Sequence, residues 1–142
     1  MTAVAPEKTL YTARATVQGG REGSATSSDG VLDVSLTAPK EMGGPGTGTN
    51  PEQLFAAGYA ACFTSAVTAV ARKEKVDVTG ICTEGEVDFG PVGSGYGLAV
   101  TLRVSVPGLD RSTLSDLLEK AHQVCPYSNA TRGNIPVELV AV

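Results

Sequence analysis

Three cysteines and a single histidine are the residues of this sequence whose side chains are most suited to chemistry. Cys62 lies in an Ala-rich stretch, Cys125 directly precedes Pro126, and Cys82 lies near the start of a predicted strand. A thiolate is a strong nucleophile, and two thiols that meet can form a disulfide. An odd number of cysteines without a Cys-x-x-Cys motif favours neither a disulfide scaffold nor a thioredoxin-type site. Residue type alone does not separate a reactive thiol from a small buried core residue.

His122 lies three residues before Cys125, so the two side chains are neighbours if both belong to one helix. This spacing permits a Cys–His hydrolase using Cys62 or Cys125, which would also need an acid to orient the imidazole. A zinc site is the weaker alternative, because its four ligands would have to converge from scattered positions without the usual close spacing.

The elements that must position these residues follow from the hydrophobic periodicity. Alternating apolar residues predict strands at 10–17, 31–37 and 98–106, with further strands at 22–28, 86–89 and 137–142. Asp29-Gly30 predicts a turn that joins 22–28 and 31–37 as an antiparallel pair. Residues 38–49, rich in Gly, Pro and Thr, predict a loop.

Two helices are expected. The first begins at Asn50-Pro51-Glu52 and runs to about residue 75, and the second covers residues 112–124 and is stopped by Pro126. The first helix is apolar nearly all round, so we expect it to be buried at the centre of the domain. The pattern predicts an α+β fold with mainly antiparallel sheets packed around a central buried helix and a second helix, in one domain over residues 1–142.

Composition and charge exclude some classes of function. A net charge of −4 argues against nucleic-acid binding, which needs a basic surface. No uninterrupted run of 18 apolar residues is present, so no membrane span or membrane partner is expected. The N-terminus lacks the apolar core of a signal peptide, which predicts a cytoplasmic protein in which stable disulfides are rare.

Four motifs together resemble the organic hydroperoxide resistance (Ohr) proteins of the Ohr/OsmC family. The motifs are residues 10–13 with 19–21, residues 27–34, residues 50–63 and residues 121–134. They extend over nearly the whole chain, and the last two are long and unusual. The resemblance is stronger to the Ohr branch than to the OsmC branch.

The resemblance implies a thiol peroxidase that reduces organic hydroperoxides to alcohols. Carried over to this sequence, Cys62 is the peroxidatic cysteine, Cys125 is the resolving cysteine, and Arg21 and Glu52 complete the site. The family also implies an intertwined homodimer, no bound cofactor or metal, and reduction by a lipoylated protein or dihydrolipoamide. Cys82 has no counterpart in this mechanism. A Cys–His hydrolase using His122 and a non-enzymatic thiol redox sensor remain the alternatives.

The chemistry gives Arg21 and Glu52 physical roles but raises a problem of distance. A guanidinium beside Cys62 would lower the pKa of its thiol, and the Glu52 carboxylate would orient that guanidinium. Ten residues of continuous helix would separate Glu52 from Cys62 by about 15 Å along the axis. We therefore expect either a helix break near Gly58 or a contribution of Arg21 or Glu52 from a partner subunit, with the site at or near the dimer interface.

An apolar mouth around the thiolate would favour alkyl and lipid-derived hydroperoxides over hydrogen peroxide. The candidates for its lining are Phe55, Tyr59, Phe63 and Met42.

Overall fold

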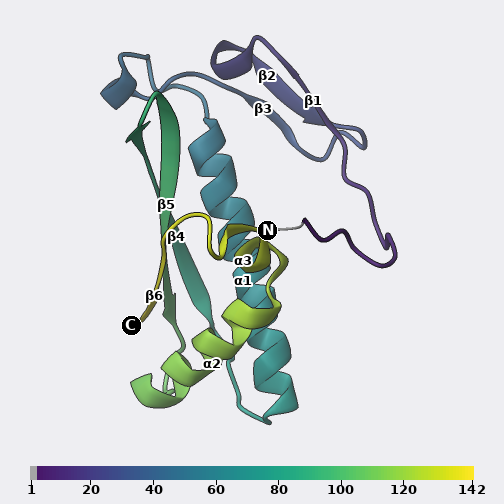
Figure 1. Ribbon diagram of the computed structural model, residues 1–142, viewed down its shortest axis with the longest axis vertical. Helices are drawn as coiled ribbons and strands as arrows, with labels where there is room; N and C mark the ends of the chain where they lie inside the picture. Colours follow the sequence, from purple (N-terminus) through teal and green to yellow (C-terminus); the bar gives the residue numbers. More distant parts are fainter. Residues whose placement is uncertain (1–2) are drawn as a thin grey trace. The chain divides into compact units, whose positions relative to one another are not determined.

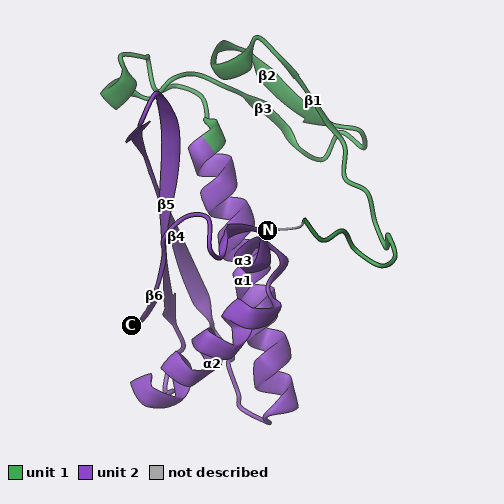
Figure 2. Cartoon of the chain, in the orientation of Figure 1, with its two compact units in different colours: residues 1–51 green, residues 52–142 purple. Residues whose placement is uncertain are grey.

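The computed structural model describes residues 3–142. The chain forms two compact units that divide between Pro51 and Glu52 (Figure 2). The expectation of one domain over residues 1–142 stays a prediction.

The N-terminal unit is a three-stranded antiparallel sheet in the order β1-β2-β3. Its elements are β1 (Ala15–Gln18), the 3₁₀ turn η1 (Gly20–Glu22), β2 (Ser24–Ser27), β3 (Asp33–Ser35) and the 3₁₀ turn η2 (Lys40–Met42). The predicted antiparallel pairing of 22–28 with 31–37 is confirmed, although both strands are shorter than expected. At the predicted turn, the Asp29 carboxylate accepts a hydrogen bond of 3.0 Å from the Val31 N–H, and Gly30 has φ 76°. Residues 10–14, which we expected to extend the first strand, lie outside it.

The C-terminal unit contains three helices and a second three-stranded sheet (Figure 1). Its elements are α1 (Pro51–Lys73), β4 (Cys82–Val92), β5 (Gly95–Ser105), α2 (Arg111–Val124), α3 (Pro126–Thr131) and β6 (Val137–Ala141). The strands β4 and β5 form a long antiparallel hairpin, and β6 pairs in parallel with β5. Both predicted helices and all three predicted strands are present, so the α+β class is confirmed. Pro126 ends α2 as predicted and also begins α3, because proline suits the first position of a helix.

The core of the C-terminal unit lies between the sheet, α1 and α2. Alternate residues of β5 point into it, and every third or fourth residue of α1 and α2 meets them. The fully buried members from these elements include Tyr59, Phe63, Val67, Leu102, Val104 and Leu114. The backbone of α1 approaches β4 closely at Gly85, where a Cβ would lie 2.6 Å from the Ala56 carbonyl oxygen. Gly85 is therefore required by packing between α1 and the sheet.

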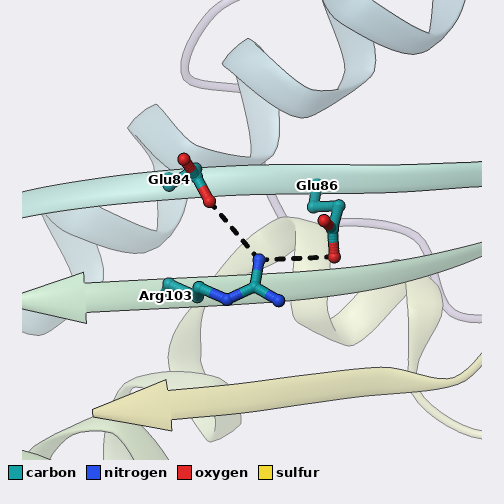
Figure 3. Close-up of polar contacts among 3 residues, drawn as sticks. All are labelled: Glu84, Glu86 and Arg103. Atoms are coloured by element: carbon teal, nitrogen blue, oxygen red, sulfur yellow. Dashed lines mark hydrogen bonds and ion pairs between the residues drawn. The ribbon is translucent and has the colours of Figure 1, made fainter. Parts of the chain in front are cut away.

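The sheet face that points away from α1 is polar. Strand alternation directs Glu84 and Glu86 to this face, because Thr83 and Gly85 face α1. The Arg103 guanidinium lies between the two carboxylates, at 3.3 Å from each (Figure 3). All three side chains are exposed, so each pair contributes at most about 1 kcal/mol to stability.

The helix α1 is continuous over 23 residues, so the helix break expected near Gly58 is wrong. Gly58 instead makes room for a neighbouring ring, since a Cβ at this position would lie 3.1 Å from the hydroxyl oxygen of Tyr127. The second expectation, that a partner subunit supplies Arg21 or Glu52, stays a prediction.

One face of α1 is buried within the chain and another is exposed. The buried face carries Tyr59, Phe63 and Val67, whereas the exposed face carries small residues at a spacing of four. These small residues are Ala57, Ala61, Ser65 and Ala69. The expectation of a helix buried all round is therefore met on one side only.

By length and composition, α1 is also apolar enough to cross a membrane, with a mean hydropathy of 1.6. Gly, Thr and Ser interrupt its apolar run, and the expectation of no membrane span stays a prediction. The core helix of a globular protein meets the same criterion, and α1 contributes fully buried side chains to the core described above.

Candidate functional site

The sulfurs of Cys62 and Cys125 lie 3.5 Å apart, with the Cys125 thiol directed as donor toward the Cys62 sulfur. Both thiols are free. Cys62 lies in the middle of α1 and is partly exposed, whereas Cys125 is fully buried at the junction of α2 and α3. A disulfide S–S bond is about 2.05 Å long, so the two sulfurs need to approach by only about 1.5 Å to be joined.

The junction between α2 and α3 sets the position of Cys125. Its backbone is extended, with φ −65° and ψ 124°, because the following proline disfavours the helical conformation at this residue. The Cys125 N–H still donates to the Ala121 carbonyl at 2.9 Å, and its carbonyl accepts from the Asn129 N–H at 2.9 Å. The residue therefore caps both helices while its side chain points to α1.

The environment of Cys62 disfavours the thiolate. Burial raises the pKa of the Cys62 thiol, the backbone N–H of Tyr127 lowers it, and the neighbouring Cys125 raises it again because two close sulfurs resist a shared negative charge. The net direction is upward. A nearby cation would counter this effect and favour a nucleophilic role for Cys62.

Three aromatic rings surround the helix turn that precedes Cys62. The rings of Phe55, Tyr59 and Tyr127 have centroids 5.6–6.1 Å apart in edge and tilted arrangements. Tyr127 packs over Gly58 and is partly exposed, whereas Tyr59 is fully buried. Tyr127 therefore connects the solvent-exposed surface with the thiol pair.

An open apolar pocket of about 480 Å³ lies beside α3. Its walls include Phe55, Leu98, Pro126, Tyr127 and Ile135. Because Tyr127 contributes its ring to the pocket and its backbone N–H to Cys62, the pocket adjoins the thiol pair.

The mouth residues predicted from the sequence are correct in part. Phe55 lines the pocket, but Tyr59 and Phe63 are fully buried and belong to the core, so that part of the prediction is wrong. Met42 belongs to the N-terminal unit and is partly exposed there. The sequence reasoning missed Tyr127, although Tyr127 lies within one of the four motifs.

The imidazole of His122 is engaged with a serine. Its Nδ1 lies 2.7 Å from the hydroxyl oxygen of Ser128, and Ser128 is fully buried. Burial and the nearby Arg132 guanidinium lower the pKa of His122, while Glu119 raises it slightly, so the ring is neutral at neutral pH. Within residues 3–142, no group of three or more His, Cys, Asp or Glu side chains is arranged to hold a metal ion.

The remaining candidate residues lie at defined places in their own units. Arg21 is in η1, the turn between β1 and β2, and is preceded by Gly19 and Gly20 with φ 79° and 58°. Glu52 is in the first turn of α1, about 15 Å along the axis from Cys62. Cys82 is exposed at the first residue of β4. Of the four predicted site residues, the structure brings Cys62 and Cys125 into contact, and it places Glu52 ten residues before Cys62 on the same helix.

Comparisons with known proteins show the family and the fold of the chain. The sequence model of the OsmC-like protein family matches residues 44–140. An organic hydroperoxide resistance protein of Xanthomonas axonopodis pv. citri is 58% identical over 136 residues, covering 94% of this chain and 96% of that protein. The crystal structure of the organic hydroperoxide resistance protein OhrB of Bacillus subtilis superposes with a TM-score of 0.86 at 46% identity, covering 94% of this chain and all of that chain. The structure of an organic hydroperoxide resistance protein of Elizabethkingia anophelis superposes with a TM-score of 0.89 at 48% identity, covering 94% and 97%.

Proposed function

Because this chain belongs to the organic hydroperoxide resistance proteins of the OsmC-like family, we propose that it is a thiol peroxidase that reduces organic hydroperoxides to alcohols. The observation that carries the proposal is the 3.5 Å contact between the sulfurs of Cys62 and Cys125. A partly exposed thiol that touches a fully buried thiol is suited to meet a substrate first and to be resolved by its neighbour second.

The reaction proceeds in three steps. The Cys62 thiolate attacks the O–O bond of the hydroperoxide, so one oxygen passes to sulfur as a sulfenic acid, and the other leaves with a proton as the alcohol. The Cys125 thiol then displaces the hydroxyl group from the Cys62 sulfur, which forms the disulfide and releases water. An external dithiol reopens this disulfide by exchange and is itself oxidised to a disulfide. We propose a dihydrolipoyl group, free or carried on a lipoylated protein, as that dithiol.

Activation of Cys62 needs a cation because burial raises the pKa of its thiol. We assign this role to Arg21, whose guanidinium remains charged throughout the physiological pH range, and we assign Glu52 to orient it. The two glycines before Arg21, and Gly23 two residues after it, allow the backbone conformations of this turn, which would present the side chain to a site. Glu52 and Cys62 are too far apart on α1 for one guanidinium to contact both easily, which supports a site completed by a second subunit.

A homodimer is part of the proposal. The exposed small-residue face of α1 permits close approach of another element, and the N-terminal unit exposes large apolar side chains. These side chains include Leu10, Tyr11, Val17 and Val31. A second copy of the chain would remove both apolar surfaces from water. Sedimentation at micromolar concentration tests this, and a stable monomer would contradict it.

The pocket beside α3 supports selectivity for apolar hydroperoxides. Its walls of Phe55, Leu98, Pro126, Tyr127 and Ile135 offer an alkyl chain contact that hydrogen peroxide cannot use. We propose the cytoplasm as the location of the protein, where dithiols are kept reduced.

The test is turnover of tert-butyl hydroperoxide with dihydrolipoamide. Wild type and Cys82→Ser should turn over equally, because Cys82 is exposed at the start of β4 and has no role in the steps above. Cys62→Ser should be inactive, and Cys125→Ser should consume one equivalent and then stall as sulfenic or higher acids. Absence of turnover in wild type, or full turnover in Cys62→Ser, would overturn the proposal. Hydrolysis of an ester by wild type that is lost on replacing His122 would instead favour a hydrolase. Disulfide formation without turnover would favour a redox sensor.

A further inference from the structure

A row of buried hydroxyl groups lies one helical turn from the thiol pair. Tyr59 precedes Cys62 by three residues on α1, and Ser128 follows Cys125 by three residues on α3. The hydroxyl oxygens of Tyr59 and Ser128 are 2.8 Å apart, and that of Tyr59 is 3.0 Å from Thr131 Oγ1. These three side chains are at least 95% buried. The hydrogen bonds therefore join α1 to α3 beside the place where the sulfurs touch.

The protons of this network can be placed by counting donors. The Thr131 hydroxyl donates to the Ser128 carbonyl at 3.2 Å, so it must accept from Tyr59. The Tyr59 hydroxyl, having given its one proton to Thr131, accepts from Ser128. The Ser128 oxygen in turn accepts from His122 Nδ1, 2.7 Å away. Every hydroxyl thus donates once and accepts once, which gives the network a single direction.

The network fixes the one segment whose position decides whether the sulfurs can join. Cys62 is carried by the middle of the continuous helix α1, whereas Cys125 lies in an extended junction between two helices. A small rotation at that junction would move Cys125 away from Cys62. Ser128 and Thr131 tie α3 to Tyr59, and His122 ties the last turn of α2 to Ser128. Both sides of the junction are therefore held to α1.

We propose that Tyr59 and Ser128 are positioning residues that hold Cys125 against Cys62 and so set the rate of disulfide formation. The proposal rests on the peroxidase mechanism above and assigns these residues to its second step. In that step the S–O bond of the Cys62 sulfenic acid breaks, the S–S bond to Cys125 forms, and the thiol proton leaves with the hydroxyl group as water. The network acts on Cys125 through α3 and touches neither the peroxide nor the sulfenic oxygen.

The test separates the two steps in single turnover. One equivalent of tert-butyl hydroperoxide is mixed with reduced protein, and sulfenic acid and disulfide are each quantified by quenching and mass spectrometry. Tyr59→Phe removes one hydroxyl and keeps the buried ring. We expect it to leave sulfenic acid formation within twofold of wild type and to slow disulfide formation by about tenfold or more, because it removes the buried hydrogen bonds to both Ser128 and Thr131. Sulfinic acid should then accumulate when hydroperoxide is in excess.

Two further variants provide the comparison. Ser128→Ala should slow disulfide formation about as much as Tyr59→Phe, because each variant breaks two hydrogen bonds of the network, those of Ser128 being to Tyr59 and His122. Thr68→Val is the matched control, since the Thr68 hydroxyl lies on the same helix but bonds the Thr64 carbonyl at 2.9 Å. It should leave both steps unchanged. Wild-type disulfide formation in a folded Tyr59→Phe protein, or equal slowing in Thr68→Val, would overturn the proposal.

A second measurement needs no peroxide. In a Cys82→Ser background, methyl methanethiosulfonate transfers a methylthio group to the partly exposed Cys62 and releases methanesulfinate. Cys125 then attacks the Cys62 sulfur of this mixed disulfide and displaces methanethiol, which forms the Cys62–Cys125 disulfide. Mass spectrometry follows the loss of the methylthio group, and Tyr59→Phe should slow this loss by about tenfold or more. Unchanged displacement would refute the positioning role. Slowed displacement in a protein that forms no sulfenic acid with hydroperoxide would instead refute the peroxidase mechanism alone, so the two failures are distinguishable.

Discussion

Replacing Gly58 by alanine tests how the helix and the aromatic pocket are coupled. Glycine in the middle of a helix costs about 0.5–1 kcal/mol relative to alanine, so Gly58→Ala should stabilise α1 by that amount if nothing opposed it. The added Cβ would lie 3.1 Å from the Tyr127 hydroxyl oxygen and 3.4–3.5 Å from two ring carbons. The ring must then move outward by a few tenths of an ångström and lose contact with Tyr59 and Phe55.

We therefore expect the two effects of Gly58→Ala to cancel, with a change in unfolding free energy below about 0.5 kcal/mol. In a Tyr127→Ala background the opposing contact is absent, and the same substitution should stabilise the protein by about 1 kcal/mol. Urea denaturation of the four proteins of this double-mutant cycle measures the difference. Equal stabilisation in both backgrounds would refute the assignment of Gly58 to Tyr127.

The same substitution should change substrate preference. Tyr127 lines the apolar pocket, so displacing its ring should weaken contact with a bulky aromatic hydroperoxide more than with a small one. We expect the ratio of kcat/KM for cumene hydroperoxide to that for tert-butyl hydroperoxide to fall about fivefold, equivalent to about 1 kcal/mol. An unchanged ratio would show that the pocket does not receive the organic group.

Two further predictions concern the sheet and the activating cation. Gly85→Ala should lower the unfolding free energy in urea by about 1–3 kcal/mol, because its Cβ would lie 2.6 Å from the Ala56 carbonyl; Gly90→Ala on the same strand, with open space around its Cβ, should cost less than about 1 kcal/mol. Arg21→Gln should shift the pH profile of the first step to higher pH by about 1–3 units. Burial raises the pKa of Cys62 and the reactive form is the thiolate, so without the guanidinium the rate is recovered only at higher pH; an unchanged profile in stopped-flow measurements would exclude Arg21 as the activating cation.

Local patterns in the sequence predicted most of the secondary structure. The alternation of Leu98 to Val106 and the apolar stripe of residues 112–124 correspond closely to β5 and α2. The parallel pairing of β6 with β5 could not be read in this way, because a short apolar strand at the end of the chain carries no local sign of its partner. The short helix α3 was missed because Pro126 was interpreted only as the end of α2.

The candidate site was predicted by motif and corrected by geometry. No spacing rule relates Cys62 to Cys125, which are 63 residues apart, so their contact depends on the packing of α1 against the junction of α2 and α3. The misassignment of Tyr59 and Phe63 to the mouth was avoidable. With Val67 they follow a spacing of four residues, which is the signature of the core-facing side of a helix.

Gly58 shows how a correct observation led to a wrong inference. A glycine in a long helix does call for an explanation, and the distance between Glu52 and Cys62 made a helix break attractive. The actual reason, the ring of Tyr127, comes from a residue 69 positions further along the chain. Such a contact has no trace in the local sequence.

The central claim is that Cys62 is oxidised first and Cys125 resolves it. The most direct measurement is peptide mapping by mass spectrometry after reduced protein has received one equivalent of an alkyl hydroperoxide. The proposed mechanism predicts one disulfide, between Cys62 and Cys125, with Cys82 still a free thiol. A disulfide that includes Cys82, or oxidation of Cys125 while Cys62 remains reduced, would contradict it.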